Sequence, residues 1–530
     1  MTATYGYNTS GSLASVTYSD GTSVTNGYNR RGRLQTVAEN GTATTTFSYN
    51  NAGQLLSESY ANGILAGVAI TNGYDSYMRL TNVSSFGLQS LYAYDEASRL
   101  KSVSDGTNSA TYSYVANSSL VDNIAFAQSA NARMTTIKQY DYLTRLTNIL
   151  ARTNGTTIFS SRYQYNNANQ RTNSVQADGS RWAYQFDSLG QVSSAKKYFS
   201  SGTPVAGQQY EYLFDTIGNR MTTKQGGDSY GGGLRSSTSS VNLLNQYSQR
   251  TVPNAVDVLG NANSSATVSI NGQRAYRNGD YFRKELAIDN SSAAVNQAVT
   301  NLAVLNNGTN ADIIATNVGT LFLARNPEVF GHDLDGNLTN DGRWVFTWNA
   351  ENRLANVVAL AAIPAAAKLK LDFAYDFSGR RLQKVVYTNN AGTYVGQYTN
   401  KFVYDGWNLI AILDANNNVA ESFHWGSDLS GSLQGAGGVG GLLSLTVHSG
   451  SLAGAYFYNY DGNGNVVGLT RAAMEPLPPG MNTMPSERFC APADRWPSSI
   501  RSCSPPSTTI GKPACTISAI GTTTPAREDG

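Results

Sequence analysis

The chain has 530 residues, more than one ordinary domain needs, so it holds several domains or a repeat array. Its 38 Lys and Arg nearly balance its 36 Asp and Glu, which argues against a general electrostatic hold on nucleic acid or on an anionic membrane. No apolar run is long enough for a membrane-spanning helix, and residues 1–5 lack the features of a secretory signal. The 32 tyrosines favour half-buried β-strands.

From its first residues the chain repeats one motif: Tyr, Asp or Asn, two variable residues, Gly, often Arg, Gln or Asn, and Leu. The Tyr, Asx and Gly of the clear copies are Tyr7, Asn8 and Gly11; Tyr28, Asn29 and Gly32; Tyr49, Asn50 and Gly53; Tyr375, Asp376 and Gly379; and Tyr460, Asp461 and Gly464. Weaker copies begin at Tyr74, Tyr94, Tyr140, Tyr165, Phe186, Phe214, His332, Trp348 and Tyr404. Asx followed by Gly three residues later suits a type I turn, in which Tyr ends a strand and Asx caps the turn.

A second turn lies midway between the first ones. It reads Asp20-Gly21, Asn40-Gly41, Asn62-Gly63, Asp105-Gly106, Asn154-Gly155 and Asp178-Gly179. These dipeptides favour tight hairpins in which both central residues have positive φ. The chain therefore reverses about every ten residues, which predicts an all-β, antiparallel ribbon whose hairpins must stack or wind together to bury an apolar face.

Arginine often stands at the sixth position of the motif, as in Arg33 and Arg380. Two interpretations stay open: an arginine that lies against a neighbouring tyrosine ring, and an ordinary solvated side chain.

The array is interrupted after residue 225. Residues 226–249 begin with a glycine-rich stretch and predict a flexible linker. Residues 250–326 alternate like strands around Asn-Gly turns and resemble the small immunoglobulin-like β-sandwich of bacterial surface and carbohydrate-active proteins. This module either binds a glycan or partner, or acts as a spacer. The array resumes over residues 327–470, where the glycine-rich stretch at 431–441 lacks the ending of a phosphate loop and is expected to be a flexible loop.

The motif copies at 5–220 and 330–470 resemble the YD-repeat or Rhs (rearrangement hotspot) family. The stretch from Asp333 to Thr339, followed by that from Trp348 to Leu354, also resembles the family's D-x-D-G-N-L-T and W-D-A-E-N-R-L segments. The resemblance implies hairpins wound into a hollow shell. In toxin members the shell houses a C-terminal effector, and in others it serves surface recognition.

The composition changes after Thr470. All three cysteines and ten of the 14 prolines lie beyond it, and none of the 32 tyrosines does. Residues 504–530 can be back-translated into DNA with free choice among synonymous codons. When that DNA is read one base earlier, it can encode a string that resembles the Rhs core hallmark K-Y-x-D-x-E-T-G-L-Y-Y. We therefore expect residues 471–530 to be a disordered tail translated out of frame, with the Rhs core truncated. The chain also opens in mid-repeat, so we expect it to be an internal piece of a longer reading frame.

Other chemistry finds little support in the sequence. The three cysteine spacings match no zinc motif, and no Ser-His-Asp arrangement can be argued from the spacing of His332, His424 and His448. Asp333 and Asp335 suit turn capping better than a cation site. We expect no catalytic, cofactor or metal site.

The resemblance thus implies a non-catalytic shell scaffold from a secreted or cell-surface protein, whose partner would be a C-terminal effector polypeptide. Two alternatives stay open: an adhesion module that binds cell-surface glycans, and a frameshifted product without function.

Overall fold

The computed structural model describes residues 2–473 and 517–519, and within them the chain is almost entirely antiparallel β-structure. A single 3-10 turn, η1 (Ala365–Ala367), is the one helical element in these residues. The predicted all-β fold is confirmed, because the alternating Tyr, Val and Thr segments between the turns form the strands. The three Cys residues of the tail, Cys490, Cys503 and Cys515, lie outside the described residues.

The first sheet has 23 strands and runs hairpin by hairpin from residue 3 to residue 250, with one later strand at its end. Its strands are β1 (Ala3–Tyr7), β2 (Leu13–Tyr18), β3 (Ser23–Tyr28), β4 (Leu34–Glu39), β5 (Ala43–Tyr49), β6 (Leu55–Tyr60), β7 (Ala69–Tyr74), β8 (Leu80–Ser85), β9 (Leu88–Tyr94), β10 (Leu100–Ser104), β11 (Asn108–Tyr114), β12 (Val121–Gln128), β13 (Asn131–Tyr140), β14 (Leu146–Thr153), β15 (Thr156–Tyr165), β16 (Arg171–Gln176), β17 (Arg181–Phe186), β18 (Val192–Tyr198), β19 (Pro204–Phe214), β20 (Arg220–Gly226), β21 (Leu234–Val241), β22 (Tyr247–Arg250) and β30 (Glu328–Val329).

Between β22 and β30 the chain leaves this sheet and forms a β-sandwich. One of its sheets contains β23 (Ala255–Asn261), β26 (Tyr276–Asn278), β27 (Tyr281–Ala287) and β43 (Ile517–Ala519). The other contains β24 (Thr267–Ile270), β25 (Gln273–Arg274), β28 (Val295–Leu305) and β29 (Ile313–Leu323). Val258, Ile270, Phe282 and Leu321 are buried between the sheets, so the sandwich has an apolar core of its own.

The sandwich is not isolated from the repeat array. Arg235 of β21 forms ion pairs with Asp257 and Glu285 of the sandwich, and Arg283 holds Asp257 in place within the sandwich at 2.7 Å. The Tyr281 hydroxyl donates to the Ala206 carbonyl of β19. These polar contacts fix the sandwich against β19–β21.

The second sheet has 12 strands and continues the array after β30. Its strands are β31 (Gly331–His332), β32 (Leu338–Asn340), β33 (Trp344–Trp348), β34 (Leu354–Ala359), β35 (Leu369–Tyr375), β36 (Arg381–Asn390), β37 (Thr393–Asp405), β38 (Asn408–Leu413), β39 (Val419–Trp425), β40 (Leu442–Val447), β41 (Gly454–Tyr460) and β42 (Val466–Arg471).

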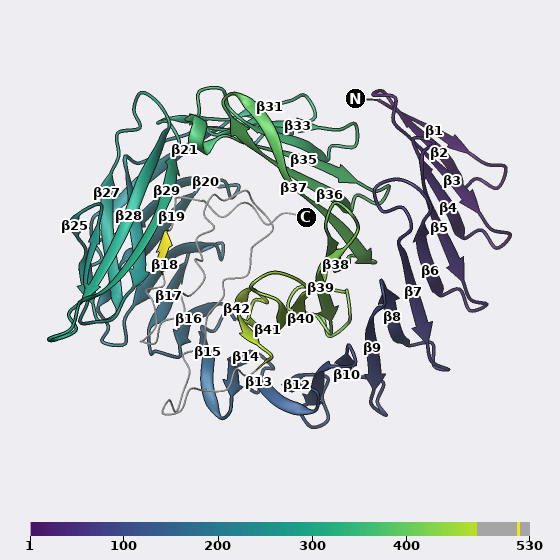
Figure 1. The fold of residues 1–530 in the computed structure, drawn as a ribbon, viewed down its shortest axis with the longest axis horizontal. Coiled ribbons are helices and arrows are strands. Elements are labelled where there is room, and N and C mark those ends of the chain that lie inside the picture. The colour runs from purple at the N-terminus through teal and green to yellow at the C-terminus, as the bar shows by residue number, and fades with distance from the viewer. Residues whose placement is uncertain (1, 474–516, 520–530) are drawn as a thin grey trace.

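The two sheets wind into a spiral. The first sheet runs around the periphery, and the later strands of the second sheet, β38–β42, lie inside its curve (Figure 1). The main apolar core lies between the layers and takes residues from both, for example Val103 and Phe126 from the first sheet and Leu413 and Phe457 from the second. The rings of Phe126 and Phe457 are 5.0 Å apart. The inner faces of the hairpins are thus buried by winding rather than by a separate domain.

The structure differs from the sequence expectations at two segment boundaries. The expected linker at 226–249 is instead a continuation of the sheet, because β21 pairs with β20 and β22 pairs with β21. The expected break after residue 470 lies slightly later, since β42 ends at Arg471 and Ala472 is buried in the interlayer core. Residues 517–519 add β43 to the edge of β23, where the sequence predicts no ordered structure, while the rest of the tail from residue 474 lies outside the described residues.

The midway turns also differ in part from the expectation. Asn40-Gly41 and Asn154-Gly155 have positive φ at both residues, as their type predicts. At Asn62-Gly63, Asp105-Gly106, Asp20-Gly21 and Asp178-Gly179 only the glycine has positive φ. In the last two the loop has one residue more, and the glycine forms a bulge after a type I turn: Gly21 donates to the Tyr18 carbonyl at 3.0 Å.

Candidate functional site

The YD turn itself is the unit from which the molecule is built. In the copy at Tyr28 the Asn29 side-chain oxygen accepts hydrogen bonds from the backbone N–H groups of Arg31 and Arg33, at 2.9 and 3.0 Å. The Gly32 N–H donates to the Asn29 carbonyl at 2.9 Å, and Gly32 has a φ of 74°. The Asx side chain therefore caps a three-residue loop that ends in a left-handed glycine.

The clear copies share this geometry. Asn8, Asn50, Asp376 and Asp461 each accept the backbone N–H four residues later, at 2.8 to 3.0 Å. The glycines of these copies all have positive φ: Gly11, Gly53, Gly379 and Gly464.

The tyrosine of each turn binds the repeat before it, which the motif alone does not predict. Its hydroxyl donates to the carbonyl of the residue that begins the strand after the preceding turn. These bonds are 2.6 to 3.2 Å long and join Tyr28 to Leu13, Tyr49 to Leu34, Tyr74 to Leu55, Tyr94 to Leu80, Tyr114 to Leu100, Tyr140 to Val121, Tyr165 to Leu146, Tyr375 to Leu354, Tyr404 to Arg381 and Tyr460 to Leu442. Trp348 and Trp425 donate an indole N–H in the same way. Each such bond stabilises the array by about 1 kcal/mol.

The arginine at the sixth position binds the repeat after it, which decides between the two interpretations. The guanidinium of Arg33 lies 5.7 Å from the centre of the Tyr49 ring, and that of Arg380 lies 5.9 Å from the Tyr404 ring. Arg33 also donates to the Asn50 carbonyl at 3.3 Å, and Arg380 to the Gly406 carbonyl at 3.0 Å. Tyrosine and arginine thus clamp each turn to both neighbours.

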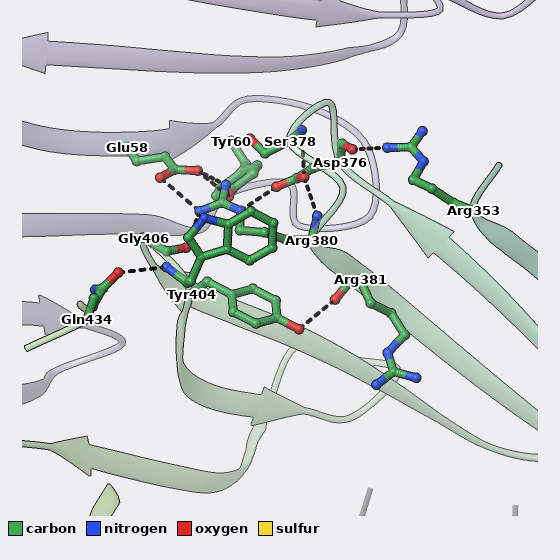
Figure 2. Close-up of polar contacts among 11 residues, drawn as sticks. Glu58, Tyr60, Arg353, Asp376, Ser378, Arg380, Arg381, Tyr404, Gly406 and Gln434 are labelled. Carbon is green, nitrogen blue, oxygen red and sulfur yellow. Dashed lines mark hydrogen bonds and ion pairs between the residues drawn. The ribbon is translucent and has the colours of Figure 1, made fainter. Parts of the chain in front are cut away.

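The most distinctive polar site lies where the two layers meet (Figure 2). Arg380 of the second sheet forms ion pairs with Asp376 of its own turn, at 2.6 Å, and with Glu58 of β6. Its guanidinium also lies 3.2 Å from the Tyr60 hydroxyl, which itself donates to Glu58 at 2.6 Å. The side chains of Glu58, Asp376 and Arg380 are at most 6% exposed. We call these four residues the seam network.

Two further carboxyl groups lie near the seam network. Burial and the nearby Glu58 carboxylate raise the pKa of Asp405 to about 6. Burial and the Asp376 carboxylate raise the pKa of Glu39 to about 7. The seam network and its surroundings therefore have more carboxyl groups than the nearby arginines neutralise. Two of these carboxyl groups, Asp405 and Glu39, take up protons close to neutral pH.

A Ser-His-Asp row also lies between the layers, although the spacing of these residues predicts none. The Ser90 hydroxyl is 2.8 Å from Nδ1 of His424, and Asp105 is 3.6 Å from Nε2. Ser90 and His424 are both buried, and the adjoining cavities of about 20 and 10 Å³ hold little more than one water each. Burial lowers the pKa of His424, so the ring is neutral at neutral pH. With no room for a substrate, this row is an interlayer contact.

The remaining candidates have structural roles. Asp333 accepts the backbone N–H of Asn337 at 2.8 Å, as turn capping predicts. The glycine-rich stretch at 431–441 is held by Asp428, which accepts the N–H groups of Ala436 and Gly438, so it is not the free loop that the sequence predicts. In the residues that the structure describes, no three His, Cys, Asp or Glu side chains group as metal ligands, and no helix is long and apolar enough to span a membrane.

The YD turns can be found from the sequence because their signal is local. The seam network cannot be found in this way, because Glu58 and Arg380 are 322 positions apart. One signal is available: Glu58 is a carboxylate at an inward position of a strand that otherwise consists of Leu, Ser and Tyr.

Comparison with known proteins supports the family. The RHS Repeat family model matches residues 28–64. The chain is 32% identical over 154 residues to the tRNA3(Ser)-specific nuclease WapA of Bacillus spizizenii, and 29% identical over 147 residues to the tRNA nuclease WapA of Bacillus subtilis. These matches cover 29% and 27% of this chain but only 5% of each WapA protein.

Solved structures with some likeness include the TcdB2-TccC3 complex and the Photorhabdus luminescens Tc holotoxin pore. Their sequence identities are 10% and 11%, and their TM-scores are 0.30 and 0.31. The likeness covers 89% of this chain, and 30% and 25% of those chains. The matched RHS Repeat over residues 28–64 and the recurring YD turns show that the chain contains RHS (YD) repeats.

Proposed function

We propose that the chain is the shell part of a longer toxin-related RHS protein, and that this shell encloses a C-terminal effector polypeptide of that protein. The observation that carries the proposal is the interlayer seam. Two sheets of the same array are wound one inside the other and held by a buried ion network between β6 and the turn that follows β35. A scaffold that only displays a surface does not need such closure.

The described residues also favour a structural role over a catalytic one. Glu39 and Asp405, whose pKa values are raised to about 7 and about 6, lie near the seam network, and the Ser90 and His424 pair has no space for a substrate. The nuclease activity in the WapA names belongs to those proteins, of which this chain matches 5%. Secretion or surface display of the parent protein is part of the same proposal.

The test begins with the nucleotide sequence that encodes residues 471–530 and with the DNA downstream of it. We expect the other frame to continue into the Rhs core hallmark and a further open region. The protein with that frame restored should protect its C-terminal region from added protease, and Arg380→Met should remove the protection. Absence of the hallmark, or equal cleavage in both proteins, would overturn the proposal. Selective binding of the chain on a glycan array would favour the adhesion alternative.

A further inference from the structure

The inserted β-sandwich has one sheet against the repeat array and the other sheet away from it. The contacts with β19–β21 come from β23 and β27, through Asp257 and Tyr281. The other sheet, in the order β25, β24, β28, β29, therefore has an outer face at the periphery of the molecule (Figure 1). This is the module for which the sequence leaves open whether it binds a partner.

The edge of this outer sheet is the long strand β29. All 11 of its residues pair with β28 without a register shift, and β29 pairs with no other strand in the part of the chain that the structure describes. On its outer face Ile314 and Val318 are 63% and 62% exposed, and a Cβ added at Gly319 would meet no atom within 4 Å. One side of β29 therefore presents backbone N–H and C=O groups that no described strand satisfies.

This edge lacks the features that keep strand edges from pairing with other chains. Edge strands of soluble proteins are usually short, or they carry a charge, a proline or a bulge. The other edges of the sandwich follow this rule, because β25 and β26 have two and three residues and carry Arg274 and Arg277, while the edge of β23 pairs with β43. Residues 313–320 of β29 contain no charged residue, no proline and no bulge. An edge of this kind is suited to pairing with another strand.

We propose that β29 pairs with β29 of a second copy of this chain, antiparallel and about a two-fold axis, so that two sandwiches share one continuous sheet. The strand is complementary to itself. Pairing about Thr316 places Ile314 of each copy opposite Val318 of the other, on the same face. These are the apolar side chains that a single sandwich leaves exposed. Cross-strand pairs of β-branched residues stabilise an antiparallel ladder, and no like charges meet.

Pairing about Thr316 also keeps the second copy clear of the repeat array. Only the end of β29 meets the array, where the Arg343 guanidinium lies 4.5 Å from the centre of the Phe322 ring. Residues 312–320, which this pairing uses, come before that contact. A strand pair of this length buries less area than a standard protein–protein interface, so the dimer is expected to be weak. It is independent of the proposed shell function, since no residue of the seam network takes part.

Sedimentation velocity of the full chain between about 1 and 100 μM tests the pairing. The wild type should form dimers, and I314K/V318K should lose about tenfold or more in affinity, because each new lysine then faces a lysine of the other copy. The control A298K/T300K adds the same charge on the same face of β28, which pairs with both β24 and β29, and should dimerise like the wild type. Hydrogen exchange of the β29 amides should slow as the wild type dimerises.

Four results would overturn the proposal. A wild type that stays monomeric at every concentration has no second copy at this edge, and unchanged dimerisation of I314K/V318K would place the contact elsewhere. Equal losses in I314K/V318K and the control would assign the contact to the outer face of the sheet instead of its edge. Slow exchange of the β29 amides in a monomer would mean that another segment of the same chain covers the edge. If far-UV circular dichroism shows I314K/V318K to be misfolded, T316K repeats the test with a single pair of facing lysines.

Discussion

Replacement of Arg380 by Met should be among the most damaging single changes in the array. The substitution keeps the apolar stem but removes the guanidinium that pairs with both Glu58 and Asp376, whose side chains are 6% and 0% exposed. Both carboxylates would stay buried without that cation. Breaking a buried pair in this way costs about 3–5 kcal/mol. The expected result is a clearly lower midpoint of urea unfolding than in the wild type. Intrinsic fluorescence near neutral pH measures this midpoint.

The chain offers a matched control at the same motif position. Arg33 makes the same clamp, with a bond to the Asn50 carbonyl and a ring contact with Tyr49, but no carboxylate is paired with it among the described contacts. Arg33→Met should cost about 1 kcal/mol. The double variant E58M/R380M should recover only the part of the loss that is due to Glu58, because Asp376 stays buried without the cation. If R380M is no worse than R33M, the seam network does not hold the layers together.

Three further changes test the turns, the seam carboxyls and the tail. Tyr49→Phe removes the bond to the Leu34 carbonyl and should cost about 1 kcal/mol in urea unfolding, whereas Tyr5→Phe, at an exposed site, should cost nothing measurable. Asp405 and Glu39 bind protons more tightly when folded, so stability should fall as the pH rises from about 4 to about 7; D405N and E39Q should flatten this slope, and an unchanged slope would refute their burial as its cause. Deleting residues 474–530 removes only β43 from the described strands and should leave the unfolding midpoint unchanged; a lower midpoint would mean that the tail packs on the shell.

The sequence predicts well what is local. The strands and YD turns follow from alternation and from Asx and Gly at fixed spacing, because each turn satisfies its own hydrogen bonds. The expected type is wrong for the Asp-Gly turns at residues 20 and 178, since one residue of loop length decides between a tight turn and a bulged one. The expectation of a linker at 226–249 is wrong because the glycine-rich residues 227–233 form a short turn capped by Asp228, and the residues after it pair as β21 and β22.

What the sequence does not predict is which hairpin faces which. The contacts between layers join residues about 300 positions apart, and the core between the layers is built from apolar residues of many hairpins in both sheets. The Tyr and Arg contacts between neighbouring repeats can therefore stabilise a ribbon of any length. They do not determine the register of the inner layer relative to the outer layer.

We infer that the buried charges supply this specificity. If the inner layer moved by one hairpin, Arg380 would leave Glu58, and both would be buried without each other at a cost larger than that of any single clamp. Ser90 and His424 add a second polar match further along the same interface. The repeats thus provide most of the stability through many similar weak bonds, while a few buried polar pairs select one register of the spiral from several that apolar packing alone would permit.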